Sequence, residues 1–122
     1  MRLLTWNIQW GRGMDGRVDL ARIHAAIAAH GEFDVICLQE VAVNFAELPG
    51  SQGEDGVSEL YRLFPGHLPV YGPAVDLPAG GGGRKLFGNL ILSRLPVGQV
   101  FRHLLPWPAD ASAPSMQRVL LE

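Results

Sequence analysis

The first part of the chain changes from strand-like to helix-like spacing and back. In residues 3–9, apolar and polar side chains alternate, so that one face of an extended segment is apolar, which predicts a strand. Apolar residues recur at helical spacing over residues 19–30, and Gly31 is the expected end of that helix. Residues 33–39 have a continuous apolar centre, typical of a strand covered on both faces. This order predicts a βαβ unit whose two strands are parallel neighbours.

The middle of the chain is less regular. Residues 54–64 place apolar side chains on one side of a short helix, which Pro65 and Gly66 would end. Residues 68–71 are predicted as a short strand, and residues 78–83 as a glycine-rich loop.

Two apolar segments flank a tight corner at residues 94–96. We predict that residues 86–93 and 97–105 are strands, paired as a hairpin around this corner. A further apolar run covers residues 116–121 and has no turn residue after it, so we expect the sequence to end inside a strand.

The composition is that of one folded domain with many loops. Of 122 residues, 48% are hydrophobic and 18% charged, which excludes a polar disordered chain. No apolar run approaches the ~18 residues of a membrane span, and the N-terminal apolar stretch is too short for a signal peptide, so we expect a cytoplasmic protein. The single cysteine, Cys37, excludes an intrachain disulfide and a multi-cysteine zinc site, and its apolar flanks indicate a small buried hydrophobe.

The net charge of -2 changes the expectation for ligands. A broad basic surface for coating nucleic acid is absent. A phosphate ligand would therefore need a local device, such as a metal ion or a few arginines.

Two polar residues stand at the ends of predicted strands. Asn7 lies near the carboxyl end of the first, and Glu40 directly follows the second. If these strands are parallel, both side chains emerge at the edge of the sheet that the carboxyl ends of the strands form. This is the edge at which open α/β sheets bind ligands. A carboxylate beside an amide suits Mg²⁺, for which one or two carboxylates, several waters and a substrate phosphate suffice. The alternative, from position alone, is that both residues mark where strands exit to solvent.

Residues 3–11, 34–41, 87–97 and 117–121 are similar to four segments of one enzyme superfamily. In that order, they resemble the opening strand of the endonuclease/exonuclease/phosphatase superfamily, a second strand that ends in the metal-binding glutamate, a later strand with its corner, and the strand after that. They occur in the family's order, with family-like separations, over nearly the whole chain.

The resemblance implies an α/β (α+β) fold, the N-terminal half of a four-layer α/β sandwich with mixed β-sheets. It implies hydrolysis of a phosphodiester or phosphomonoester with Mg²⁺ or Mn²⁺, in which the metal stabilises charge on the phosphoryl group. Carried over, Glu40 matches the metal ligand, and Asn7 matches the asparagine that organises the metal and the phosphate. Arg118 matches an arginine that many members place beneath the site; the alternative is a solvated strand residue or ion-pair partner. Superfamily substrates include DNA, RNA, phosphoinositides, sphingomyelin and nucleotides.

Two segments that the resembled family uses do not occur in the sequence. The general base is usually a histidine paired with an aspartate in a Ser-Asp-His-like segment, and further ligands come from a Gly-Asp-x-Asn segment. Structural roles are expected for the histidines that are present, which are His24, His30, His67 and His103. A site without a base can bind metal and phosphate, yet it lacks the ~10²–10⁴-fold rate acceleration that proton transfer supplies. We therefore expect residues 1–122 to be a partial domain of a parent enzyme.

The glycine run before Arg84 and Lys85 has two interpretations. It is not a P-loop, because no Ser or Thr follows Lys85 and the glycine spacing is wrong. It is either a flexible connector or a mobile loop whose two cations bind a substrate phosphate.

A second hypothesis comes from a different class of protein. The chain would be a non-catalytic fragment or binding module of the same fold. Half of a two-sheet sandwich leaves an apolar sheet face uncovered, and such a face usually finds a partner. We therefore expect self-association, as a homodimer with sheet packed on sheet.

Overall fold

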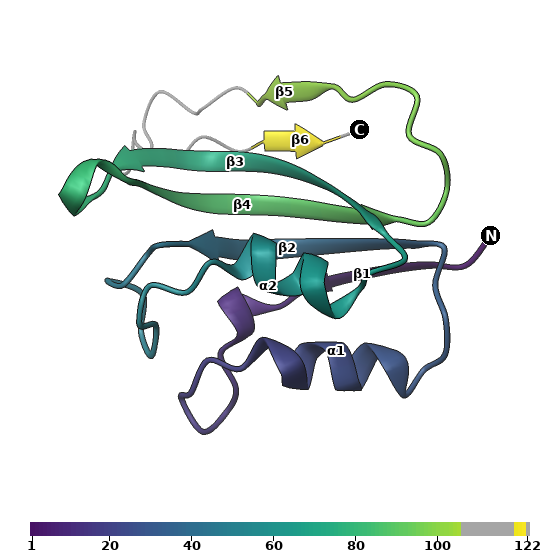
Figure 1. Ribbon diagram of the computed structural model, residues 1–122, viewed down its shortest axis with the longest axis horizontal. Coiled ribbons are helices and arrows are strands. Elements are labelled where there is room, and N and C mark those ends of the chain that lie inside the picture. Colours follow the sequence, from purple (N-terminus) through teal and green to yellow (C-terminus); the bar gives the residue numbers. More distant parts are fainter. Residues whose placement is uncertain (106–118, 122) are drawn as a thin grey trace.

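A four-stranded mixed sheet is the centre of the structure. The computed structural model describes residues 1–105 and 119–121. The strands are β1 (Leu3–Asn7), β2 (Val35–Val43), β3 (Leu68–Pro78) and β4 (Arg84–Ser93), in the order β1-β2-β4-β3 (Figure 1). As predicted, β1 and β2 are parallel neighbours, whereas β4 is antiparallel to both β2 and β3.

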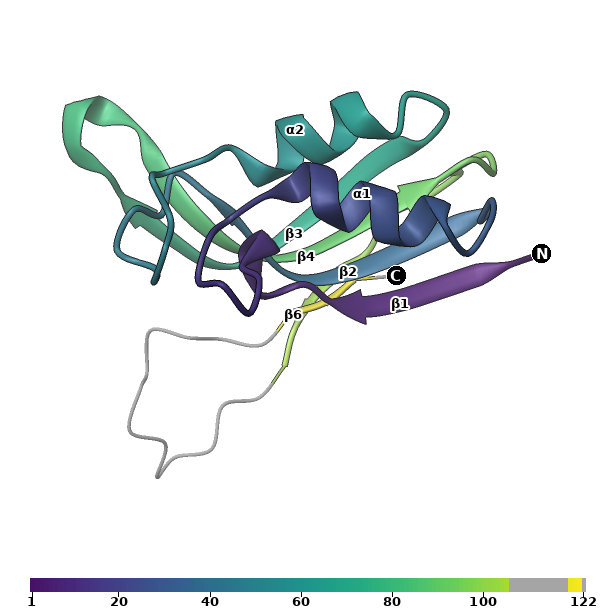
Figure 2. The ribbon, with the colours of Figure 1, turned by 90° about the horizontal axis from the view of Figure 1, so that it is seen from below.

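Two helices cover one face of this sheet. Helix α1 (Leu20–Ala28) and helix α2 (Gly56–Leu63) lie on the same side of it (Figure 2). Each begins at an aspartate whose side chain accepts a backbone N–H three residues later: Asp19 from Arg22, and Asp55 from Ser58. These caps satisfy N–H groups that the first turn leaves without a partner. Both predicted helices are confirmed.

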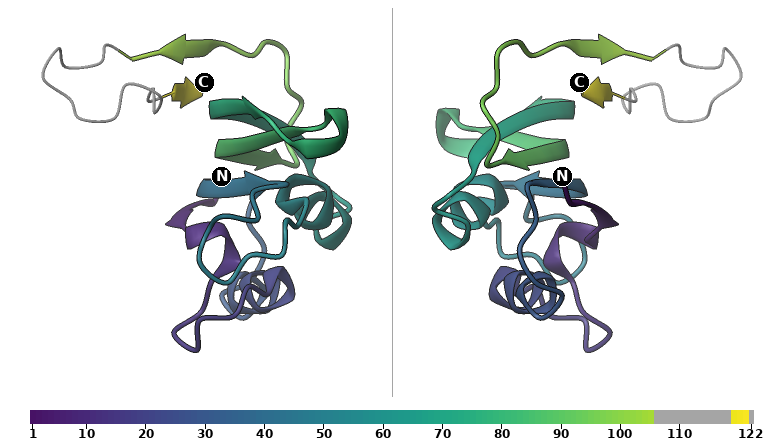
Figure 3. Two further views of the ribbon diagram at one scale, coloured as in Figure 1. Left: turned by 90° about the vertical axis from the view of Figure 1, so that its left-hand side faces the viewer. Right: turned by 90° about the vertical axis from the view of Figure 1, so that its right-hand side faces the viewer.

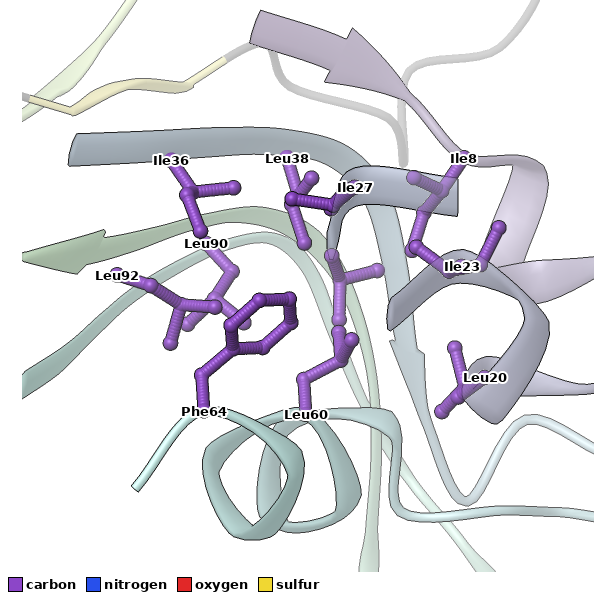
Figure 4. Packing of buried hydrophobic residues seen from close by; sticks show 11 residues of the cluster. Ile8, Leu20, Ile23, Ile27, Ile36, Leu38, Leu60, Phe64, Leu90 and Leu92 are labelled. Carbon is purple, nitrogen blue, oxygen red and sulfur yellow. The ribbon is translucent and has the colours of Figure 1, made fainter. Parts of the chain in front are cut away.

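The hydrophobic core lies between the sheet and the two helices. Figure 4 shows side chains of β2 and β4 that point toward those of α1 and α2. Leu38, Leu60, Leu90 and Leu92 are completely buried there. Burial of one such side chain stabilises the fold by about 1.5–3 kcal/mol. The core therefore fixes β2 and β4 as the centre of the sheet.

No described helix is long and apolar enough to cross a membrane.

The predicted hairpin of residues 86–93 with residues 97–105 is wrong. Both edges of β4 are occupied, by β2 and by β3, and the hairpin partner of β4 is β3. Strand β5 (Arg102–Leu104) instead pairs antiparallel with β6 (Val119–Leu121) in a separate two-stranded sheet. The glycine run joins β3 to β4 and contains the short 3₁₀ helix η2 (Gly80–Gly82).

The two-stranded sheet lies on the face of the main sheet away from the helices. Figure 3 shows β5 and β6 beyond β3 and β4, and β6 contacts both of these strands. A second sheet therefore packs on part of the face that was expected to be open. The self-association of the chain through the remainder of that face stays a prediction.

Asp34 ties together the amino ends of β1 and β2 and the end of β4. Its carboxylate accepts the backbone N–H of Arg2 at 2.6 Å and a guanidinium N–H of Arg94 at 2.9 Å. Its backbone carbonyl accepts the Arg94 N–H at 2.9 Å. The hydrogen bond from Arg2, followed by that from Arg94, lowers the pKa of Asp34 below its usual value.

Asp34→Asn is expected to destabilise the fold in a pH-dependent way. Because folding lowers the pKa of Asp34, its carboxylate stabilises the native state above the ordinary aspartate pKa of ~3.9, and this contribution is lost as the pH falls through the lowered value. Urea unfolding of both proteins should therefore show a difference in unfolding free energy at pH 6 that shrinks in strong acid. A difference that is constant with pH would contradict this role.

Candidate functional site

Glu40 lies in a β-bulge at the carboxyl end of the parallel pair. Leu38 pairs with Leu90 and Val41 pairs with Gly88, so two residues of β2, Gln39 and Glu40, face one residue of β4. Glu40 has a φ of 57°, in the left-handed region that non-glycine residues seldom adopt. A bulge re-aims a side chain and increases the local twist, and such conformations cluster at functional sites.

A hydrogen bond joins Asn7 to Glu40. The Asn7 Nδ2 donates to Glu40 Oε1 at 2.9 Å, and Asn7 Oδ1 accepts the backbone N–H of Gln9 at 3.1 Å. Gln9 begins the 3₁₀ helix η1 (Gln9–Gly11), which directly follows β1 and contacts β2. Both polar ends of the Asn7 amide are therefore used, and the amide fixes the orientation of the Glu40 carboxylate. The structure brings together the two residues that the sequence placed at this edge.

The donor set at this edge fits a magnesium-type ion. Glu40 Oε1 accepts from Asn7, whereas Oε2 has no hydrogen bond among the described residues, so one carboxylate oxygen is open to a cation. One carboxylate is enough for Mg²⁺, because this ion keeps several waters and shares substrate phosphate oxygens. The part of the chain that the structure describes holds no cluster of three or more His, Cys, Asp or Glu side chains that could bind a metal ion.

Three aromatic rings lie beside the bulge. Trp10 of η1 and Phe87 of β4 have ring centroids 6.2 Å apart, and Phe45, just after β2, lies 6.4 Å from Phe87. The indole N–H of Trp10 donates to the carbonyl of Pro49 at 3.1 Å. Sequence analysis did not single out these rings, because they come from three separate parts of the chain.

Arg84 and Lys85 lie in β4, and each has an acidic partner. The Arg84 Nε is 2.7 Å from Asp76 Oδ1, and the Lys85 ammonium is ion-paired with Glu47. A phosphate that binds either cation would therefore have to compete with a carboxylate. Arg118 lies outside the described residues.

Arg12 was missed by sequence analysis. Among the arginines and lysine that the structure describes, its guanidinium is the one with neither an ion pair nor a hydrogen bond. Arg12 and Asn7 line one cavity of about 510 Å³, together with Gln9 and Met14. A signal was present in the sequence, where Arg12 stands between two glycines soon after Asn7.

Three of the four histidines make contacts away from Glu40. His30 bonds the carbonyl of Ala26 at 2.9 Å, and His67 bonds that of Phe33 at 3.0 Å. The His24 ring packs edge-on against Phe64. His30 and His67 therefore lie at the amino ends of β1 and β2, at the edge of the sheet opposite the bulge.

His103 and Cys37, which the sequence analysis also considered, lie in strands. His103 is in β5, beside the ring of Phe101. Cys37 is half-buried in β2, and burial raises the pKa of its thiol. A raised pKa disfavours the reactive thiolate, in agreement with a packing role for Cys37.

Comparisons with known proteins point to one family. The family model described as "Endonuclease/Exonuclease/phosphatase family" matches residues 4–121. The crystal structure of an endonuclease/exonuclease/phosphatase from Beutenbergia cavernae DSM 12333 is similar, with 35% sequence identity and a TM-score of 0.77. The match covers 99% of this chain but 33% of that one, so the chain spans about a third of its relative's length. No curated protein matches the chain.

The four-stranded mixed sheet with two helices has the architecture of the N-terminal part of this family's fold, as predicted. A family model that matches nearly the whole chain, and a similar solved structure of the same family, agree with each other. The chain belongs to the endonuclease/exonuclease/phosphatase family, whose name denotes hydrolysis of phosphoester bonds.

Proposed function

We propose that this chain forms the metal- and phosphate-binding edge of a divalent-metal-dependent phosphoester hydrolase. The observation that carries the proposal is the left-handed Glu40 in the bulge, hydrogen-bonded to Asn7. A residue is held in a costly backbone conformation only where the surrounding structure over-determines it, and such positions cluster at active sites. Family membership supports the same reaction class.

The chain's own residues would divide the work at this edge. Glu40 would hold the cation through its open carboxylate oxygen, and Asn7 would keep that carboxylate oriented. Arg12, which has no acidic partner among the residues that the structure describes and lines the cavity beside Asn7, would contact a substrate phosphate oxygen. When bound, Mg²⁺ or Mn²⁺ supplies polarisation of the phosphoryl oxygens. Arg84 and Lys85 would bind phosphate only after their ion pairs with Asp76 and Glu47 break.

We assign proton transfer to neither Asn7, Glu40 nor Arg12. His24, His30 and His67 contact other groups, as described above, and the sequence has neither a Ser-Asp-His nor a Gly-Asp-x-Asn segment. We therefore propose metal and phosphate binding for residues 1–122, and full turnover for a protein that also has both segments.

Metal binding and metal-dependent hydrolysis test the proposal together. We expect saturable binding of one Mn²⁺ per chain by titration calorimetry, reversed by EDTA. Hydrolysis of bis(p-nitrophenyl) phosphate should require added Mg²⁺ or Mn²⁺ and should be slow without a base. Failure to bind either ion would contradict the proposal. Metal binding without hydrolysis, combined with a dimer in sedimentation, would favour the alternative of a non-catalytic, self-associating module.

A further inference from the structure

The aromatic cluster of Trp10, Phe45 and Phe87 does not belong to the hydrophobic core. The core lies between the sheet and the helices, and none of the three rings is part of it. All three side chains are half-buried, so each leaves ring surface open to solvent. The rings are also not stacked face to face, since the two ring pairs have interplanar angles of 55° and 80°. A tilted or edge-on pair covers fewer ring faces than a face-to-face pair does.

The cluster lies next to the bulge that contains Glu40. Trp10 is three residues after Asn7, in the 3₁₀ helix that contacts β2. Phe87 pairs with Ala42 and is two residues before Asn89, the residue of β4 that faces the bulge. Three separate segments therefore carry their rings to the same end of the sheet as the Asn7–Glu40 hydrogen bond.

Polar contacts hold the rings of Trp10 and Phe45 in place before any ligand binds. The Trp10 indole N–H donates to the Pro49 carbonyl at 3.1 Å. The Lys85 ammonium lies 5.3 Å from the centroid of the Phe45 ring and is ion-paired with Glu47. Asn44, the residue before Phe45, donates from its amide to the carbonyl of Arg84 at 3.1 Å. Because these two rings are already ordered, a ligand that contacts them loses little free energy to their immobilisation.

We propose that Trp10 and Phe87 together bind a planar ring that is attached to the phosphate of the substrate, face-on to one of the two side chains and tilted against the other. This rests on the proposed function, and it selects phosphoesters of heteroaromatic bases over phosphoesters of sugars, polyols or aliphatic alcohols. Stacking of a base on an aromatic side chain is tolerant of base identity, because every base presents a π-face. The platform therefore recognises a base-bearing phosphoester without reading its sequence.

Binding without metal tests this platform independently of catalysis. In EDTA, the chain is expected to bind thymidine 5′-monophosphate more tightly than 2-deoxyribose 5-phosphate, which has the phosphate and the sugar but no base. Phe87→Leu, which keeps an apolar side chain but removes the planar face, should weaken binding of thymidine 5′-monophosphate about five-fold or more. Its affinity for 2-deoxyribose 5-phosphate should not change. Titration by NMR measures both affinities.

Phe33→Leu is the matched control, because Phe33 is also partly buried but packs beneath Arg2 just before β2, at the opposite end of the sheet. It should leave both affinities unchanged. Intermolecular NOEs between the thymine and the ring protons of Trp10 and Phe87 are expected in the wild-type chain, so the test does not depend on the folding of a variant. NOEs only to other residues, equal affinity for the two ligands, or an equal loss in Phe33→Leu would each overturn the platform.

The two proposals fail separately. Metal-dependent hydrolysis of bis(p-nitrophenyl) phosphate, together with equal binding of the two ligands, would leave the hydrolase and remove the platform. Selective binding of thymidine 5′-monophosphate with no metal binding would support the platform and remove the hydrolase.

Discussion

Glu40→Gln is expected to remove divalent-metal binding while leaving the fold intact. The substitution keeps the shape of the side chain and an oxygen that can accept the Asn7 amide, but it removes the negative charge and the carboxylate oxygen that is open to a cation. Loss of the Glu40 carboxylate should cost more than the ~10–100-fold in affinity typical of an outer-shell mutation. Titration calorimetry with Mn²⁺ measures this loss, and circular dichroism checks the fold.

Glu59→Gln provides the matched control for this experiment. Glu59 is a partly exposed carboxylate on α2, where it pairs weakly with Arg62 at 4.0 Å. Neutralising it changes the net charge of the chain by the same amount without touching the bulge. Its Mn²⁺ affinity should equal that of the wild type. If Glu40→Gln binds Mn²⁺ as tightly as Glu59→Gln does, Glu40 is not the metal ligand.

Sequence reasoning placed Asn7 and Glu40 at one edge but could not find the bulge between them. The pair Gln39-Glu40 interrupts the apolar pattern, so the second strand was predicted to stop at residue 39, whereas β2 continues to Val43. The bulge exists only relative to β4, which is distant in the sequence. The local pattern of apolar and polar residues indicates which residues can form a strand. It does not indicate which residue of another strand they pair with.

The error about β3 has a similar cause. Pro69, Pro73 and Pro78 break the strand-like pattern, so only residues 68–71 were predicted as a strand, yet β3 runs from Leu68 to Pro78. Proline removes a ladder donor, but an edge strand tolerates this, because one side of it needs no hydrogen-bonded neighbour. β3 is at the edge of the four-stranded sheet. The position at the edge, which a single sequence does not reveal, explains both the length of β3 and the failed hairpin of residues 86–93 with residues 97–105.

Gly88→Ala is expected to destabilise the fold strongly, because Gly88 lies between two irregular strand pairings. On one side it pairs with Val41, next to the Glu40 bulge, and on the other with Pro73, after which Ala74 is left unpaired. A Cβ at Gly88 would lie 2.2 Å from the Gly72 carbonyl oxygen and 2.7 Å from the Pro73 Cα. These are backbone atoms, so no side-chain rotation relieves the clash.

The clash can be relieved only if β3 moves away from β4, which breaks ladder hydrogen bonds close to the candidate site. We expect Gly88→Ala to lower the unfolding free energy by about 3 kcal/mol or more, at or above the upper end of ordinary overpacking. Gly66→Ala is the control, because its Cβ would meet nothing within 4 Å, and its effect should stay within about 0.5 kcal/mol. Urea unfolding measures both. If the two variants are equally stable, β3 can move away from β4 without a loss of unfolding free energy. The close approach of the strands at Gly88 would then not be what fixes the register beside Glu40.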